Sequence, residues 1–201
     1  MTEVIFVKEG QLVRSIEVPG GQRADMVFLI MPGVSCDVKL DIRLAGEGAE
    51  ANIYGAYVCG GAEKVKIAVD MHHDLPHCNS RQLFKGIAGG TSRADFYGKI
   101  IVAQDAQKTE AYQENHNILL TDGAKVDTKP QLEIYADDVK ASHGATTGQL
   151  DESALFYMQQ RCIDRETASK FLLQAFFDEV VSTLTDDDLR EDITQRIQDI
   201  L

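Results

Sequence analysis

The segment from residue 72 to residue 78 holds the densest group of potential metal ligands in the sequence. It reads His-His-Asp-Leu-Pro-His-Cys, which brings imidazoles and a thiol close together along the chain. Imidazole and thiolate form a ligand set that suits zinc or iron. A strand would place His73 and His77 on one side, whereas Pro76 argues against a helix that presents both. We therefore treat His73, His77 and Cys78 as candidate metal ligands, with a structural turn as the alternative.

A lone histidine among small residues is the second candidate. His143 lies in Ser-His-Gly-Ala-Thr-Thr-Gly, residues 142–148, and the glycines predict a turn where a strand-rich region gives way to a helical tail. A neutral imidazole is able to bind iron near neutral pH. The alternative is a histidine that hydrogen-bonds the backbone of this turn. Ser142 is not a catalytic partner for it, because neighbouring side chains on an extended backbone point apart.

Composition limits the classes of partner. The formal net charge of −12 argues against nucleic acid, because phosphate binding needs clustered Lys and Arg. No apolar run is long enough to cross a bilayer, and the first residues do not resemble a secretory signal. The cysteines form no Cys-x-x-Cys pair and are expected to be free thiols. These observations predict a soluble cytoplasmic protein without a membrane partner.

Short strands are predicted from residue 4 to about residue 140. Polar–apolar alternation and turns rich in Gly or Pro delimit them. The clearest segments are 4–7, 25–31, 38–44, 52–58, 64–69 and 95–102. Their spacing fits a β-sandwich, a barrel or a solenoid. Periodicity does not choose among the three, because no clean sequence repeat is visible.

From Asp151 onward the pattern is helical. Asp151, Asp164 and Thr185 are predicted to cap three helices. In the second helix the predicted apolar stripe consists of Ala168, Phe171, Leu172, Ala175, Phe176 and Val180. We therefore divide the chain into a β core at 1–150 and a helical subdomain at 151–201. The excess of acidic side chains in the second part is a solvated surface or a docking surface for a basic partner.

Two motifs, in the same order along the chain, resemble those of the SufB/SufD family, the iron–sulfur cluster assembly proteins of the SUF system. One is Ser-Arg-Gln-Leu-Phe-Lys-Gly-Ile at 80–87, and the other is 142–148 followed by Phe156-Tyr157. The second motif is similar to its SufD form. A cysteine of SufB corresponds to Ala124, and a SufB glutamate corresponds to Gly144. The chain therefore resembles SufD more than SufB.

The resemblance implies a mainly β protein, a right-handed parallel β-helix with a C-terminal α-helical cap, since a stack of coils has apolar ends that need covering. It also implies a scaffold subunit, not an enzyme. No cofactor would be bound tightly, and an iron–sulfur cluster would lie transiently at a subunit interface near His143. Relatives are commonly longer, with an extra N-terminal region, so the chain resembles a short form.

The implied partners are an ATPase and a second scaffold subunit. A SufC-like ABC ATPase would bind an apolar surface of the helices, whose candidate residues are Phe156, Tyr157, Phe171, Leu172 and Phe176. The second subunit would be another copy of this chain or a SufB-like protein. A homodimer would pair through edge strands near 110–140, where an open solenoid leaves backbone groups unpaired.

Two other functions stay open on sequence alone. A catalytic β-solenoid, such as a polysaccharide-active enzyme, needs paired carboxylates, or a basic residue with calcium, on an exposed strand face. Asp70, Asp74 and Asp95 are available for that role, but no pattern aligns them. The other alternative is a structural homodimer without cluster chemistry.

Overall fold

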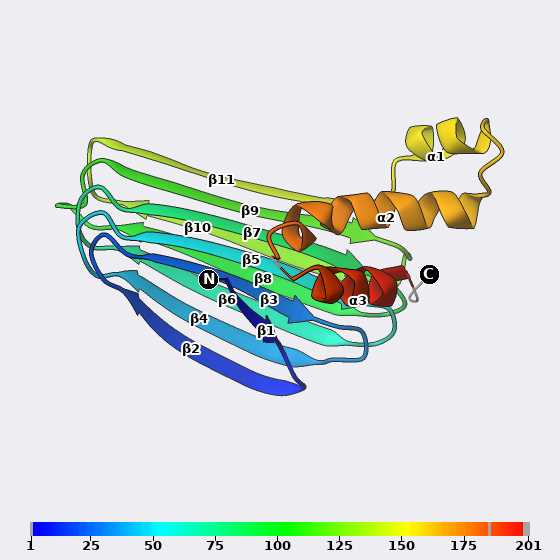
Figure 1. The fold of residues 1–201 in the computed structure, drawn as a ribbon, viewed down its shortest axis with the longest axis horizontal. Helices are drawn as coiled ribbons and strands as arrows, with labels where there is room; N and C mark the ends of the chain where they lie inside the picture. Colours follow the sequence, from blue (N-terminus) through cyan, green and yellow to red (C-terminus); the bar gives the residue numbers. More distant parts are fainter. Residues whose placement is uncertain (1, 185, 199–201) are drawn as a thin grey trace.

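The computed structural model describes residues 2–184 and 186–198 (Figure 1). In this part of the chain a series of strands precedes the helices. The strands are β1 (Glu3–Phe6), β2 (Gly10–Val18), β3 (Arg23–Ile30), β4 (Cys36–Leu44), β5 (Glu50–Cys59), β6 (Lys64–His73), β7 (Asn79–Ala88), β8 (Arg93–Val102), β9 (Thr109–Leu119), β10 (Lys125–Ile134) and β11 (Val139–Gly148). The helices are α1 (Glu152–Gln159), α2 (Arg165–Val181) and α3 (Asp187–Gln198).

The strands wind into a stack of coils. From β2 onward, consecutive strands alternate between two sheets, a 6-stranded sheet ordered β1-β3-β5-β7-β9-β11 and a 5-stranded sheet ordered β10-β8-β6-β4-β2. All pairings among the described strands are parallel, so each strand lies in register beside the equivalent strand of the next coil. The two layers are visible in Figure 1. The parallel β-solenoid that the family resemblance implied is confirmed.

Alternating side chains explain why these segments become strands. In β4 the buried side chains of Val38, Leu40 and Ile42 alternate with more exposed Lys39 and Asp41. Successive side chains of a strand point to opposite faces, so one apolar set lines the interior of the coil. The inward residues of the two sheets meet in one continuous hydrophobic core.

One corner of four successive coils contains a residue in the left-handed region, one or two positions before β3, β5, β7 or β9 of the 6-stranded sheet. Gly21, Gly48, His77 and Lys108 have φ angles of 65°, 70°, 61° and 61°. Each donates its backbone N–H to a carbonyl of the following coil. Because only two of the four are glycine, the residue type that usually marks this conformation does not repeat. The sequence therefore shows no obvious repeat although the structure has one.

Helix α2 covers the outer face of the 6-stranded sheet beside β7 and β5, and α1 and α3 pack against α2 (Figure 1). Leu173, Phe177 and Val180 of α2 form a second core with outward-facing residues of the sheet such as Leu29 and Leu83. The helical cap therefore lies along the side of the stack. This differs from the expected position, which was at one end of the stack. The reason is that this outer face is itself apolar. None of the described helices is both long enough and apolar enough to cross a bilayer.

The predicted helix caps and the predicted stripe had different outcomes. Asp151 and Asp164 are N-caps as predicted, and their side chains accept the backbone N–H groups of Ser153 and Thr167. Thr185 lies outside the described residues. The predicted stripe of α2 is confirmed at Ala168 and Val180, but between them the buried positions are Leu173 and Phe177, one residue after the predicted Leu172 and Phe176. The buried residues are Ala168, Leu173, Phe177, Val180 and Val181.

Candidate functional site

The last coil leaves one end of the stack open. Within the described residues, β10 pairs only with β8 and β11 pairs only with β9. The edge predicted near 110–140 is therefore partly wrong, because β9 is paired on both sides and the edges are β10 and β11. Inward-facing side chains of this last coil, such as Ile134, are only partly covered.

His143 lies in β11, in the middle of this open end. The turn predicted for 142–148 is wrong, because these residues form a strand that pairs in register with β9. Val139 and Ala141 of the same strand pack against the interior core. Since strand residues alternate in direction, His143 faces the interior with them. The imidazole is nevertheless exposed, because the described chain adds no further coil beyond β11.

A buried polar cluster lies directly beneath β11. Gln82, Gln113, Asn115 and Asn117 all face the interior and are at most 3% exposed. Asn117 accepts the Tyr57 hydroxyl and donates to Asn115 Oδ1 at 2.8 Å. Asn117 also donates to the Thr146 carbonyl of β11 at 3.4 Å. The cluster therefore helps to hold the strand that carries His143.

The segment 72–78 spans a corner of the solenoid. His73 ends β6 and is fully buried, with Nε2 2.8 Å from Ser80 Oγ. Burial lowers the pKa of His73 to about 4, so its ring is neutral at pH 7. His77 is exposed at the corner, and the buried Cys78 thiol donates to the Gly46 carbonyl at 3.2 Å.

These three residues do not converge. The prediction that His73 and His77 share one side is wrong, because the strand ends at His73 and the left-handed corner at His77 intervenes. Among the described residues, no group of three or more His, Cys, Asp or Glu side chains is arranged to hold a metal ion. The metal role of His73, His77 and Cys78 stays a prediction.

The carboxylates considered for a catalytic solenoid are also separated. Asp70 lies beside Asp41 and Lys99 in the ladder of the 5-stranded sheet. Asp74 pairs with Arg43, and Asp95 accepts a hydrogen bond from Arg93 at 3.1 Å. No two of these three carboxylates are register partners in the described ladders.

The candidate partner-binding residues divide into exposed and half-buried ones. Phe156 and Tyr157 of α1 are 63% and 58% exposed, and Phe171 of α2 is 48% exposed. Leu172 and Phe176 are half-buried. Figure 1 shows α1 standing beyond α2, away from the sheets. Exposed aromatic side chains of this kind are a common feature of protein-binding surfaces.

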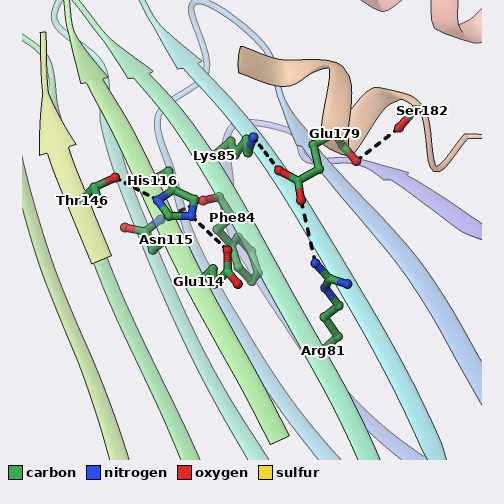
Figure 2. A network of polar contacts seen from close by, with 9 residues as sticks. All are labelled: Arg81, Phe84, Lys85, Glu114, Asn115, His116, Thr146, Glu179 and Ser182. Carbon is green, nitrogen blue, oxygen red and sulfur yellow. Dashed lines mark hydrogen bonds and ion pairs between the residues drawn. The ribbon is translucent and has the colours of Figure 1, made fainter. Parts of the chain in front are cut away.

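An ion pair fixes α2 to the sheet (Figure 2). Glu179 of α2 lies 2.8 Å from Lys85 Nζ and 3.8 Å from Arg81, both on β7. The hydrogen bond from Lys85 lowers the pKa of Glu179. The Lys85 ammonium also lies 5.0 Å from the centre of the Phe176 ring. Lys85 is buried, and its ion pair with Glu179 offsets part of the cost of removing the ammonium from water.

A polar row continues from this ion pair to β11. His116 of β9 is the register partner of Lys85. Its Nδ1 lies 2.8 Å from Thr146 Oγ1 on β11, and its Nε2 lies 3.1 Å from Glu114 Oε2 (Figure 2). The outer face of the sheet thus links the helical subdomain to the strand of His143.

Sequence reasoning did not identify the buried polar cluster or the helix anchor. Both faces of β9 carry polar residues, so the sequence does not show which face is buried. Lys85 belongs to one of the two family-like motifs, which was the available signal for the anchor.

Comparison with known proteins agrees with these features. Residues 24–176 match the family model described as SUF system FeS cluster assembly, SufBD core domain. The iron–sulfur cluster assembly protein SufD of Escherichia coli is 46% identical over 127 residues, which cover 63% of this chain and 30% of that protein. An iron–sulfur cluster assembly SufBD family protein of Mycobacterium leprae is 31% identical over 180 residues, which cover 86% of this chain and 46% of that protein.

A SufBD family protein of Synechocystis is 41% identical over 109 residues, which cover 54% of this chain and 24% of that protein. The chain thus spans less than half the length of each of these relatives.

Proposed function

The chain belongs to the SufBD family, and we propose from this membership that it is a cytoplasmic, non-enzymatic scaffold subunit of a SUF-type iron–sulfur assembly complex. The observation that carries the proposal is the position of His143. Its imidazole faces inward at the open end of the solenoid, where a second subunit has access to it. A cluster assembled there is cargo and is bound transiently.

His143 needs ligands from another subunit. Iron–sulfur clusters are held mainly by cysteine thiolates. Cys36, Cys59 and Cys78 are buried, and burial raises the pKa of the Cys36 thiol to about 11 and that of Cys59 to about 12. Protonated, enclosed thiols are poor ligands. The fourth thiol, Cys162, is exposed but lies between α1 and α2, outside the strands of the solenoid. We therefore place the remaining ligands of a cluster at His143 on the subunit that faces it.

The open end is the proposed interface with this second subunit, either another copy of the chain or a SufB-like protein. β10 and β11 offer unpaired edges, and Ile134 and Tyr135 expose apolar surface beside them. Unpaired edges and exposed apolar side chains favour strand addition.

Light scattering tests the homodimer. Ile134→Asp is expected to shift micromolar protein from dimer to monomer, because it places a charge in the interface. Val13→Asp is the matched control, since Val13 is exposed on β2, at the opposite end of the 5-stranded sheet from β10. A monomeric wild-type protein, without any partner present, would rule out the homodimer and leave the SufB-like partner.

The proposed second partner is a SufC-like ATPase bound at the exposed aromatic residues of α1 and α2. Exchanging both Phe156 and Tyr157 for Ser is expected to abolish capture of the ATPase while the fold stays intact. Neither side chain belongs to either hydrophobic core. Val13→Ser controls for the loss of an exposed apolar side chain. Undiminished capture by the double variant would show that the ATPase binds elsewhere.

The assembly role is tested by His143→Ala in the complex with both partners. We expect several-fold less iron and sulfide per complex, because a methyl group cannot replace a nitrogen ligand. The melting temperature should stay within about 2 °C, since an exposed side chain contributes little packing. His72→Ala, on the outer face of β6, is the control, since β6 belongs to the other sheet and its register partners are β4 and β8. Equal cluster loading in His143→Ala and wild type would refute the ligand role of His143. Absence of iron and sulfide from both complexes would leave a structural homodimer without cluster chemistry.

A further inference from the structure

Three polar side chains lie at equivalent positions on successive strands of the 6-stranded sheet and form a ladder inside the last three coils. Gln82 on β7 is the register partner of Gln113 on β9, and Gln113 is the register partner of His143 on β11. All three face the interior, and adjacent parallel strands are about 4.8 Å apart. The ladder therefore runs from the closed interior to the exposed imidazole.

The hydrogen bonds of this ladder stop one step before His143. Gln113 Nε2 donates to Gln82 Oε1 at 2.9 Å. Gln113 Oε1 is buried and has no hydrogen-bond partner among the described residues. An amide places its oxygen and nitrogen on different sides, so the nitrogen bonded to Gln82 leaves the oxygen free for another donor. Buried acceptors are rarely left without one.

Gly98 makes room for the amide of Gln113. A Cβ atom at Gly98 would lie 2.3 Å from Gln113 Oε1 and 2.4 Å from Gln113 Nε2. The amide thus rests against the backbone of β8 across the interior. This contact fixes its place without any bond to His143.

We propose that Gln113 is a positioning residue that sets the tautomer of His143. When the exposed imidazole turns toward the interior, Gln113 Oε1 accepts the N–H of the ring nitrogen nearer to it, and the other ring nitrogen keeps its lone pair for a ligand at the open end. Histidine ligands commonly donate their second nitrogen in this way, which fixes both ring orientation and tautomer. The inference rests on the proposed function, because it assigns His143 the role of a ligand.

Nuclear magnetic resonance of the full chain tests the proposal without iron. With 15N-labelled histidine, two-bond proton–nitrogen correlations give the ratio of the two neutral tautomers of His143. Gln113→Leu is expected to change this ratio about fivefold, the effect of losing one hydrogen bond. Gly98→Ala is expected to change it in the same direction, because the added methyl group displaces the amide.

Asn115→Leu is the matched control. Asn115 lies two residues from Gln113 on the same strand and the same face, but its register partner is Ala145. This variant should leave the tautomer ratio of His143 unchanged. An equal change in Asn115→Leu would overturn the proposal, because general loosening of the interior would then explain the effect.

The proposal would also fail if Gln113→Leu and Gly98→Ala fold and keep the wild-type ratio. If Gln113→Leu does not fold, Gly98→Ala alone decides. Failure here is distinct from failure of the assembly role, which rests on iron content in His143→Ala. A shifted tautomer with normal loading in His143→Ala would support the positioning and refute the ligand role.

Discussion

The early and late coils of the solenoid have interiors of different chemistry. β3 to β6 surround side chains such as Phe28, Leu40 and Ile67, which join one apolar core. β9 instead directs Gln113, Asn115 and Asn117 inward. The early interior is covered by coils on both sides, whereas the late interior adjoins the open end. The polar interior therefore lies next to the open end, the surface that we propose as the interface with a second subunit.

A single ladder shows how abruptly the interior changes. Ile53, Gln82, Gln113 and His143 are successive register partners on β5, β7, β9 and β11. The apolar residue is followed at once by amides and then by an imidazole. Apolar burial gains free energy without regard to direction, but amides need partners in fixed geometry. The early coils thus provide stability, and the late coils provide directed groups.

The largest expected difference in unfolding free energy is between substitutions at two register partners, Phe96 in β8 and Thr128 in β10. Phe96 is 1% exposed and its ring lies 5.0 Å from that of Phe84. Phe96→Ala is expected to lower the free energy of unfolding by about 3–5 kcal/mol through lost burial and a cavity. Thr128→Val should change it by less than about 0.5 kcal/mol, since Thr128 Oγ1 has no partner in the described chain.

Urea unfolding of both variants measures these losses, and unchanged slopes would show that the same transition is compared. Similar losses in both would mean that burial of the Phe96 ring contributes no more to stability than the Thr128 hydroxyl does.

His73 is a polar residue in an early coil and should make stability depend on pH. Burial lowers its folded pKa to about 4, while the unfolded chain keeps about 6.5. The contribution of neutral His73 to the free energy of unfolding is therefore complete above the unfolded-state pKa. It is lost as the pH falls toward the folded-state pKa. The loss is about 1.4 kcal/mol per pH unit in that interval, or roughly 2 kcal/mol near pH 5.

The measurement is the difference between wild type and His73→Leu in unfolding free energy, followed from neutral pH to about pH 4.5. In His73→Leu, the free energy of unfolding should depend less steeply on pH, because the contribution of the histidine is missing. Equal slopes would mean that His73 is not a buried neutral group. Stabilisation of wild type by added zinc, absent from the variant, would instead support the metal role.

Regular alternation made part of the fold predictable. All six strands defined from the sequence exist, with ends that shift by a few residues. An apolar set alternates with a polar one in β4 and β6, whereas β3 ends in a continuous apolar run. The buried face of α2 was not predictable, because Phe171 to Phe177 is apolar at nearly every position. Which side is buried depends on the sheet beneath the helix.

The strand of His143 was hidden for a different reason. Ser142, Gly144 and Gly148 favour turns locally, and β11 forms because β9 offers a complete row of hydrogen-bonding partners. His143 itself was found through its motif. Gln113 was not, because a buried amide and a surface amide look identical in a sequence without a repeat.

The smallest expected change in stability comes from extending the polar ladder by one coil, past the boundary between apolar Ile53 and polar Gln82. Ile53→Gln would extend the ladder beside Gln82, whose buried Nε2 has no partner among the described residues. The new amide oxygen is able to accept that donor. Ile67→Gln is the matched control, since its register partners are Val38 and Phe96, which offer no hydrogen bond.

Both substitutions should destabilise the protein, because each removes a buried isoleucine. Ile53→Gln should cost about 1 kcal/mol less, which is the net worth of one hydrogen bond. Urea unfolding of the pair gives this difference directly. An equal cost would indicate that the Gln82 amide is satisfied by ordered water, and that the boundary between the two interiors is set by packing alone.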